Sequence, residues 1–195
     1  MPFWTSALSE PRRGHRFLLS LPNLISDNGN QAFRYEQYLA KTVTKPSYSI
    51  TEQAHKFLGN TYYYPGVVEW TEVNATIVNA INPDGNQILY DALTKSGYLK
   101  PDVQEDVFFN PAIAPGTVNK QGAVDALGNV IIEELNGQGG IIGTWTLNNA
   151  FIKSATFGDL SYEDDNLLNI EMTFRYDWAE YQSGEAVAAV TALNG

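Results

Sequence analysis

Near its C-terminus the chain reads LNIEMTFRYDW over residues 168–178. Apolar and polar side chains alternate strictly in this stretch, and the apolar set is Leu168, Ile170, Met172, Phe174, Tyr176 and Trp178. Successive side chains of a strand point to opposite faces, so a period of two predicts one long strand with a buried and a solvated face. The pattern places the chain among β proteins.

The segment before this strand is also β-like but less regular. Trp145, Leu147, Phe151 and Phe157 recur at odd spacings among Thr and β-branched residues, and the polar pair at 148–149 interrupts them. This spacing predicts either one bent strand or two short ones. The link at 158–166, with its acidic cluster, is expected to be a solvated turn.

Further strands are predicted upstream. They cover 16–21, 33–43, 69–79, with Val73, Ala75 and Ile77 on one face, and 130–135. Between the second and third lies a long hairpin at 47–66, with a turn signal at 58–60 and the triplet Tyr62, Tyr63 and Tyr64. Three consecutive strand residues cannot share a face, so at least one tyrosine should be exposed or buried against another molecule. The alternative, that the tyrosines pack in the subunit's own core, stays open.

One short helix is predicted where Pro83 and Asp84 precede an apolar stripe and Gly97 ends it. The stripe consists of Ile88, Leu89, Ala92 and Leu93. A loop-rich insertion at about 99–128, with an edge strand near 107–109, and a flexible tail at 183–195 complete the chain. We therefore expect a single all-β domain over 1–195.

Composition limits the function classes. The absence of cysteine excludes disulfides and thiolate sites, and a net charge of −10 argues against a protein that grips nucleic acid through its phosphates. Residues 1–56 hold seven basic and four acidic residues (+3), whereas 57–195 hold five and eighteen (−13). This polarity suits head-to-tail contact between copies, although uneven surface charge without a role explains it too.

Chemistry-bearing motifs are missing from the sequence. His15 and His55 have no ligand-like neighbours, and the glycines of 137–143 lack the Lys-Ser/Thr ending of a phosphate loop. The carboxylates of 133–134 should point to opposite faces of a strand. We expect no catalytic, cofactor or metal site, no enzyme activity and no membrane anchor.

Several short motifs carry a family resemblance. They are GTWTLNNAFI at 143–152, FGDLSY at 157–162, the strand at 168–178, KTVTKP at 41–46, YPG at 64–66 and EW at 69–70. In this order they resemble the T4-like contractile phage tail tube protein family. The sequence departs from the family pattern at Thr146 and Leu147, where the family often has a proline, and in the insertion at 99–128.

The resemblance implies two orthogonally packed antiparallel sheets in a barrel-like tail-tube fold. It also implies homohexameric rings that join their sheets and stack into the inner tube of a phage tail, in the virion, after assembly in the host cytoplasm. The implied partners are further copies of the chain, the tail sheath protein, and the baseplate and tail terminator proteins. Tape measure protein and DNA would pass through the lumen without sequence-specific binding.

Specific residues follow from this expectation. Phe57, Tyr62, Tyr63 and Tyr64 are the candidate inter-subunit contacts, and Glu171 and Asp177 are the candidate lumen-facing residues. A tube-initiating baseplate protein, or a tube subunit of a secretion system or bacteriocin, would share the fold. A ligand-binding β-barrel with an aromatic pocket is the alternative from a different class.

Overall fold

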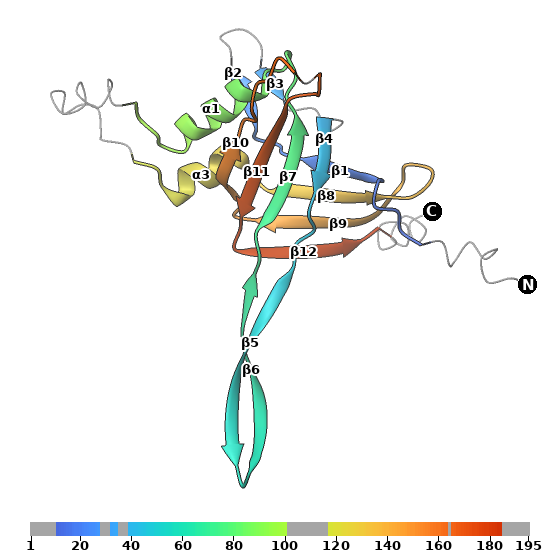
Figure 1. Ribbon diagram of the computed structural model, residues 1–195, viewed down its shortest axis with the longest axis vertical. Helices are drawn as coiled ribbons and strands as arrows, with labels where there is room; N and C mark the ends of the chain where they lie inside the picture. The colour runs from blue at the N-terminus through green and yellow to red at the C-terminus, as the bar shows by residue number, and fades with distance from the viewer. Residues whose placement is uncertain (1–10, 28–31, 35–38, 101–116, 164, 185–195) are drawn as a thin grey trace, which may run out of the picture.

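The computed structural model describes residues 11–27, 32–34, 39–100, 117–163 and 165–184. Two four-stranded antiparallel sheets form the body: a first sheet in the order β1-β8-β9-β12 and a second sheet in the order β10-β11-β7-β4. Figure 1 shows the strands of one sheet running across those of the other. The predicted pair of packed antiparallel sheets is confirmed.

The strands and helices follow one another along the chain as follows. They are β1 (Phe17–Ser20), β2 (Ile25–Asp27), β3 (Ala32–Arg34), β4 (Ala40–Val43), β5 (Tyr48–Phe57), β6 (Asn60–Trp70), β7 (Val73–Val78), α1 (Gly85–Lys95), α3 (Lys120–Leu127), β8 (Val130–Leu135), β9 (Ile141–Asn148), β10 (Phe151–Thr156), β11 (Asn169–Arg175) and β12 (Trp178–Ser183). The β2–β3 and β5–β6 pairs form separate two-stranded ribbons.

The core lies between the two sheets and the helices. The first sheet contributes Leu19, Val130, Ile132 and Leu147, and the second contributes Val73, Ala75, Ile77, Ile170, Met172 and Phe174. All of these side chains are at most 2% exposed. The alternating patterns at 73–77 and 170–174 therefore predicted the buried faces correctly, whereas Leu168 is only partly buried and Trp178 is exposed.

The predicted single strand at 168–178 is wrong, because the chain turns a corner inside it. β11 belongs to the second sheet and β12 to the first, and the turn falls at Tyr176 and Asp177. Beside this corner the chain passes from β9 in the first sheet to β10 in the second. The segment before 168 therefore forms two short strands, which was one of the two predicted alternatives. The Asp177 N–H donates to the carbonyl of Asn148 at 3.1 Å and joins the two corners. Alternation concealed the bend because Tyr176 is still buried.

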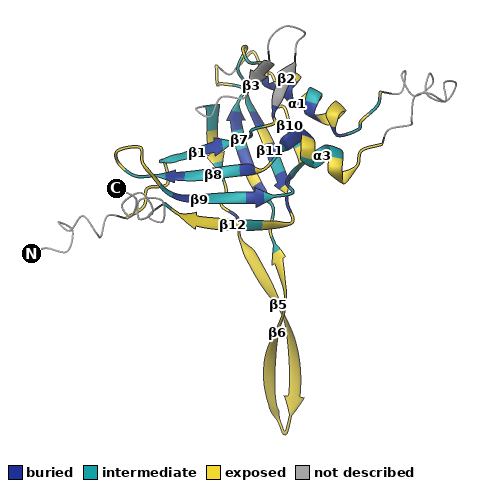
Figure 2. Cartoon of the chain, turned by 180° about the vertical axis from the view of Figure 1, so that it is seen from behind, coloured by how far each residue is buried: buried dark blue, intermediate teal, exposed yellow. Residues whose placement is uncertain are grey.

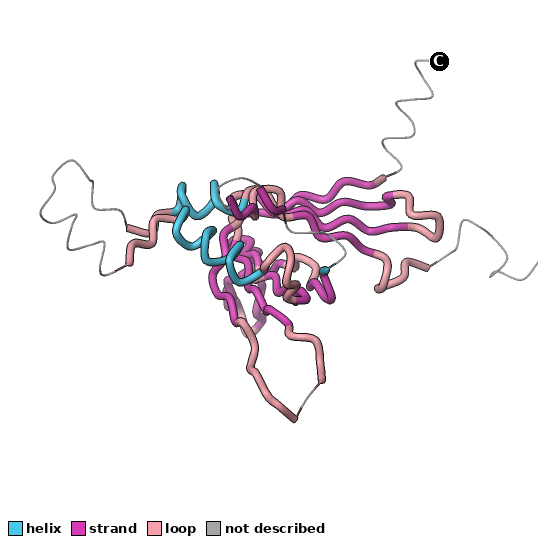
Figure 3. Tube along the Cα trace, turned by 90° about the horizontal axis from the view of Figure 1, so that it is seen from above, coloured by secondary structure: helices cyan, strands magenta, loops and turns pink. Residues whose placement is uncertain are grey.

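The described residues contain two short helices where one was predicted. In α1 the Asp84 carboxylate caps the Asn86 N–H at 2.9 Å, as expected, although Leu93 is exposed. α3 lies within the segment predicted as loops, and its first turn is capped by the Asn119 side chain, which accepts from the Gly122 N–H at 2.8 Å. Figure 3 shows both helices together at one end of the sheets. The edge strand predicted near 107–109 lies outside the described residues.

Two further boundaries differ from the prediction. The strand expected over 33–43 is two separate strands, since β3 pairs with β2 whereas β4 pairs with β7. The tail predicted from residue 183 begins later, because Ser183 still belongs to β12, and 185–195 lies outside the described residues. No described helix has the length and apolar character needed to cross a bilayer.

Candidate assembly surface

The β5–β6 hairpin projects from the body as a long ribbon (Figures 1 and 2). It spans residues 48–70, longer than the predicted 47–66, and every residue except Trp70 is exposed. Nine large apolar side chains lie exposed on it: Tyr48, Ile50, Phe57, Leu58, Tyr62, Tyr63, Tyr64, Val67 and Val68. The hairpin has almost no contact with the hydrophobic core, and its apolar surface faces solvent in a single subunit.

The tip of the hairpin is a two-residue turn. Phe57 pairs with Asn60, and both residues between them have positive φ, 48° at Leu58 and 80° at Gly59. Positive φ at both positions matches the turn that fits the twist of two-residue hairpins, in which Asn or Asp followed by Gly is preferred. Leu58 is therefore an unusual choice, and its side chain is 83% exposed.

A β-bulge divides the hairpin into two halves. Between the pairs Ile50–Val68 and Glu52–Pro65, the residues Gly66 and Val67 lie opposite Thr51 alone. The Thr51 hydroxyl accepts from the Val67 N–H at 2.8 Å, and a Cβ on Gly66 would collide with that hydroxyl. The close approach explains the glycine, and the bulge increases the twist visible in Figure 1.

The cross-strand register assigns the predicted contact residues to two faces. Tyr63 pairs with Ala54, whereas Tyr62 pairs with His55 and Tyr64 with Gln53 on the opposite face, where Phe57 also lies. The four predicted contact residues are between 49 and 63% exposed. The tyrosines therefore do not pack in the subunit's own core, and their contact with another copy stays a prediction.

The root of the hairpin is fastened to the body by aromatic and polar contacts. The Trp70 ring lies 5.5 Å from that of Tyr48 and 6.1 Å from that of buried Tyr176 at the corner. The Thr71 N–H donates to the Ser47 carbonyl at 2.8 Å, and the two hydroxyls are 2.5 Å apart. These contacts hold the ribbon at a defined place on the body.

Glu134 on β8 connects the hairpin root with the first sheet. Its carboxylate forms ion pairs with Lys45, between β4 and β5, and with Arg12 at 2.5 Å, while its own side chain is only 8% exposed. Burial disfavours the charged form of Glu134, but the hydrogen bonds from Lys45 and Arg12 outweigh it and lower the pKa of this carboxyl below its ordinary value. No pattern in the sequence indicates this pairing, because more than eighty residues separate Glu134 from either partner.

The structure separates the two predicted lumen residues. Glu171 is exposed on the second sheet, where it pairs with Thr76 and Thr156. Asp177 lies at the corner, where it accepts from Lys120 at 2.6 Å and from Asn149 at 2.9 Å. These hydrogen bonds lower the pKa of Asp177. Asp177 thus has a structural role within the subunit that sequence reasoning missed, because α3, which supplies Lys120, was not predicted.

Other regions offer little chemistry. Within the described ranges, no three His, Asp or Glu side chains gather in a way that could hold a metal ion. A mainly apolar cavity of about 500 Å³ lies between α1, α3 and β10, and its lining includes Leu89, Leu93, Val118, Ala126, Phe151 and Phe157. The cavity was not predictable from the sequence, because one of its walls is α3.

Both sheets end in open margins in the part of the chain that is described. β1 and β12 border the first sheet, and β10 and β4 border the second, each with one strand neighbour. Unpaired N–H and C=O groups along such margins are available to a strand of another molecule.

Comparison with solved structures places this geometry among known folds. A chain of the anti-feeding prophage (AFP) tube terminating cap superposes with a TM-score of 0.60, with 15% identity over 94% of this chain and 99% of that chain. The chain has a contractile-injection tube-like fold. A chain from the sheath/tube terminator of PVC, an extracellular contractile injection system, gives a TM-score of 0.60, with 18% identity over 91% of this chain and 100% of the other. A chain from the PVC sheath-tube complex gives 0.57, with 20% identity over 90% and 94%.

The tube-like fold covers most of the chain in each comparison, so it includes the two sheets and not one fragment of them. Comparison of the sequence with protein-family models and with curated proteins gives no match. At 15–20% identity the similarity concerns the fold. The expected β architecture is therefore confirmed, whereas a phage tail in particular is a matter for proposal.

Proposed function

We propose that the chain is a structural subunit of the tube of a contractile injection machine and works by stacking with copies of itself. The observation that carries this proposal is the β5–β6 hairpin, which exposes apolar side chains along its whole length. A two-stranded ribbon is marginally stable alone in water, and a large exposed apolar surface is typical of an interaction site. The tube-like fold supports the same conclusion.

Ring closure would use the open sheet margins. A margin strand of one subunit pairs with a margin strand of the next, so six copies form a continuous inner barrel whose edges are all paired. Sheath, terminator and baseplate proteins would then contact the outside and the ends of the stack. The similar chains come from a tube terminating cap, a sheath/tube terminator and a sheath-tube complex, which agrees with such partners.

The finer proposal is the inner tube of a contractile phage tail, the conduit for DNA ejection. Six copies at −10 each carry about −60, and any part of that charge lining the bore repels phosphate, so DNA slides through without adhering. Exposed Glu171 on the second sheet is the better lumen candidate, because Asp177 is engaged by Lys120 and Asn149. Its place in the bore is tested by mapping residue 171 in a reconstructed ring.

Electron microscopy of the concentrated protein tests the proposal. Wild-type protein should form rings and tubes, whereas Tyr63→Asp should fold and close into rings that no longer stack, since aromatic anchors commonly contribute about 2 kcal/mol or more each. Tyr63→Phe, which keeps the ring, should still assemble. A wild-type protein that sediments as a monomer at every concentration contradicts the proposal.

The cavity between α1, α3 and β10 favours one alternative, a ligand-binding β protein. Its volume of about 500 Å³ falls in the range of small-molecule sites, and its lining is mainly apolar. This alternative predicts a stable monomer that binds an apolar ligand, and it leaves the exposed hairpin without a role. Tyr63→Asp would then change neither the oligomeric state nor ligand binding.

A further inference from the structure

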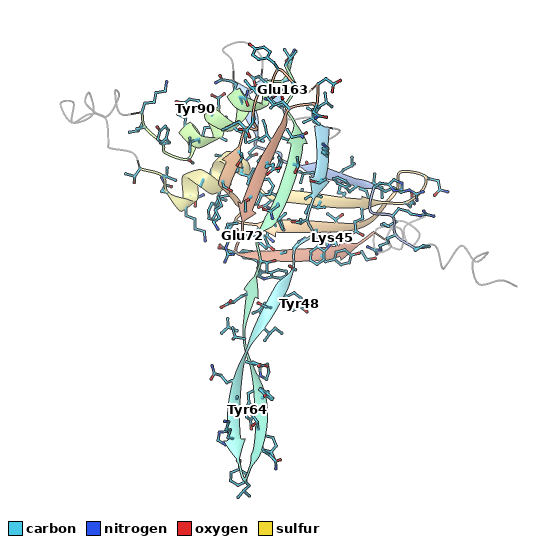
Figure 4. The ribbon with its side chains drawn as sticks, in the orientation of Figure 1. Lys45, Tyr48, Tyr64, Glu72, Tyr90 and Glu163 are labelled. Carbon is cyan, nitrogen blue, oxygen red and sulfur yellow. The ribbon has the colours of Figure 1, made fainter. Side chains whose placement is uncertain are left out.

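The hairpin leaves the body between two charged residues, one just before β5 and one just after β6. Lys45 precedes β5, and Glu72 follows β6. Figure 4 shows Lys45 and Glu72 on opposite sides of the root of the hairpin. Each of these side chains forms ion pairs with a different sheet of the body. The two strands of the hairpin are therefore attached separately.

The attachment of β5 goes to the first sheet. The Lys45 ammonium forms an ion pair with the Glu134 carboxylate on β8. In the part of the chain that is described, Glu134 is the one charged residue that is buried. A buried carboxylate that loses a cationic partner leaves an uncompensated charge in the interior, which is costly. Lys45, and with it the start of β5, is therefore tied firmly to the first sheet.

The attachment of β6 goes to the second sheet. The Glu72 carboxylate accepts from the Lys153 ammonium on β10 at 2.5 Å and lies 3.8 Å from the Arg175 guanidinium on β11. The side chain of Glu72 is 32% exposed, so water screens these pairs more than those of Glu134. Glu72 is thus the weaker of the two attachments.

The direction of the hairpin is decided at its root. Every residue of β5 and β6 except Trp70 is exposed, so the body gives the ribbon little support further out. The ten residues of β5 extend roughly 33 Å at about 3.3 Å per residue. Over that length, a tilt of about 10° at the root moves the tip by roughly 6 Å. Small changes at Lys45 or Glu72 are therefore amplified at the tip.

We propose that Lys45 and Glu72 are positioning residues that set the direction of the hairpin relative to the body, with buried Glu134 as the firmer support. The direction is a property of one subunit, whereas its use in stacking rests on the proposed function. A hairpin that is already fixed in direction loses less conformational freedom when it binds. The ion pairs at the root thus prepare each subunit for assembly.

A distance measurement within one subunit tests the proposal, and the absence of cysteine from the sequence makes it direct. Thr61→Cys near the tip and Gln121→Cys on α3, both at exposed positions, are spin-labelled together, and pulsed electron paramagnetic resonance gives their distance distribution. An excess of unlabelled protein keeps the labelled copies apart. Lys45→Met and Arg12→Met are the matched variants. Each removes one cation from the same Glu134 carboxylate, but only Lys45 belongs to the hairpin root.

Lys45→Met should broaden the distance distribution by roughly 6 Å, which corresponds to a tilt of about 10°. Arg12→Met should leave the distribution as narrow as in the wild type, and Lys45→Arg, which keeps the charge, should do the same. A narrow distribution in Lys45→Met overturns the inference. Equal broadening in Lys45→Met and Arg12→Met also overturns it, because the effect would then follow lost stability and not lost direction.

Glu72→Gln should broaden the same distribution, but by less than Lys45→Met, because its carboxylate is the more exposed one. An unchanged distribution in Glu72→Gln removes Glu72 from the proposal.

Electron microscopy then separates the positioning role from the proposed function. Lys45→Met should still close into rings but should need a several-fold higher protein concentration to stack. Tubes that form at the wild-type concentration despite a broadened distribution show that stacking does not use the fixed direction. Wild-type protein that forms no rings overturns the proposed function alone, since the distances within one subunit still decide the positioning role.

Discussion

Leu58 is unfavourable in an isolated subunit for two reasons. Its φ of 48° lies in the left-handed region, which costs an L-residue about 1–2 kcal/mol, and its side chain is 83% exposed. Asn would suit the turn better, and a polar side chain would suit water better. The proposed contact with another copy would bury this side chain and offset both costs.

The Leu58→Asn variant separates turn geometry from contact. The turn should become more favourable and the melting temperature of the monomer should stay unchanged or rise, but the concentration needed for tube formation should increase about tenfold, equivalent to roughly 1.4 kcal/mol. Sedimentation across a concentration series measures this. Thr61→Asn, also exposed on the hairpin, serves as the control, and an unchanged threshold in Leu58→Asn would show that residue 58 makes no contact.

Gly66 tests whether the bulge matters for assembly. In Gly66→Ala the new Cβ collides with the Thr51 hydroxyl and lies 3.0 Å from the Thr51 carbonyl oxygen, so the strand must shift and the twist of the hairpin changes. The free energy of unfolding should change little, because the bulge lies outside the core, but tubes should be lost. Amide chemical shifts and electron microscopy report the two effects. Gly14→Ala, whose Cβ meets nothing within 4 Å, should assemble normally.

Among the elements, the strands with alternating burial were predictable and the breaks between them were not. The period of two at Val73, Ala75 and Ile77 was enough to predict a buried strand face. The corner at Tyr176 could not be predicted, because Tyr176 is buried, as the alternating pattern of one continuous strand would also require. Asn119 is a proper helix N-cap, but it stands among Gly, Pro and Asn residues that indicate loops, so α3 escaped detection.

The candidate site was predictable in part for the same reasons. Three adjacent tyrosines required exposure of at least one, and the structure exposes all three. The ion pairs of Glu134 with Lys45 and Arg12, which we call the Glu134 clamp, were not predictable. The two basic residues approach Glu134 through tertiary packing alone. No local spacing encodes a contact between β8, the hairpin root and the N-terminal segment.

The Glu134 clamp makes stability depend on pH. The folded-state pKa of Glu134 is lowered, so its contribution is complete above the ordinary carboxyl pKa and is lost as the pH falls through the lowered value. Glu134→Gln should reduce the free energy of unfolding by about 1–3 kcal/mol at neutral pH. It should also flatten the acid limb of the stability curve. Denaturant unfolding at a series of pH values measures both.

Glu133→Gln is the matched control for this clamp, because residue 133 lies next to Glu134 with its side chain on the opposite face of β8. It should keep the wild-type pH dependence. An acid limb that is identical in wild type and Glu134→Gln would show that the ion pairs with Lys45 and Arg12 do not contribute to stability.

The molecule as a whole is polar, with the hairpin at one end and the segment around Glu163 at the other (Figure 4). In that segment and beside it, four apolar side chains are more than 70% exposed, and we call them the distal patch: Ile81, Leu160, Tyr162 and Leu167. Two different surfaces that recognise each other make a heterologous contact, which builds open stacks and not closed pairs. A variant damaged at one end should therefore still add to one end of a growing tube. The sequence showed this polarity only as an uneven distribution of charge.

Capping experiments follow from that polarity. Rings of Leu160→Asp keep an intact hairpin, so they should add to the end of a wild-type tube that presents the distal patch and then block further growth there. Rings of Tyr63→Asp should block the opposite end. Either variant, added in small amounts to wild-type rings, should shorten the tubes seen by electron microscopy, and both together should shorten them most. Val118→Asp rings should leave the length distribution unchanged. Leu160→Asp rings that incorporate throughout tubes of normal length would show that the distal patch takes no part in stacking.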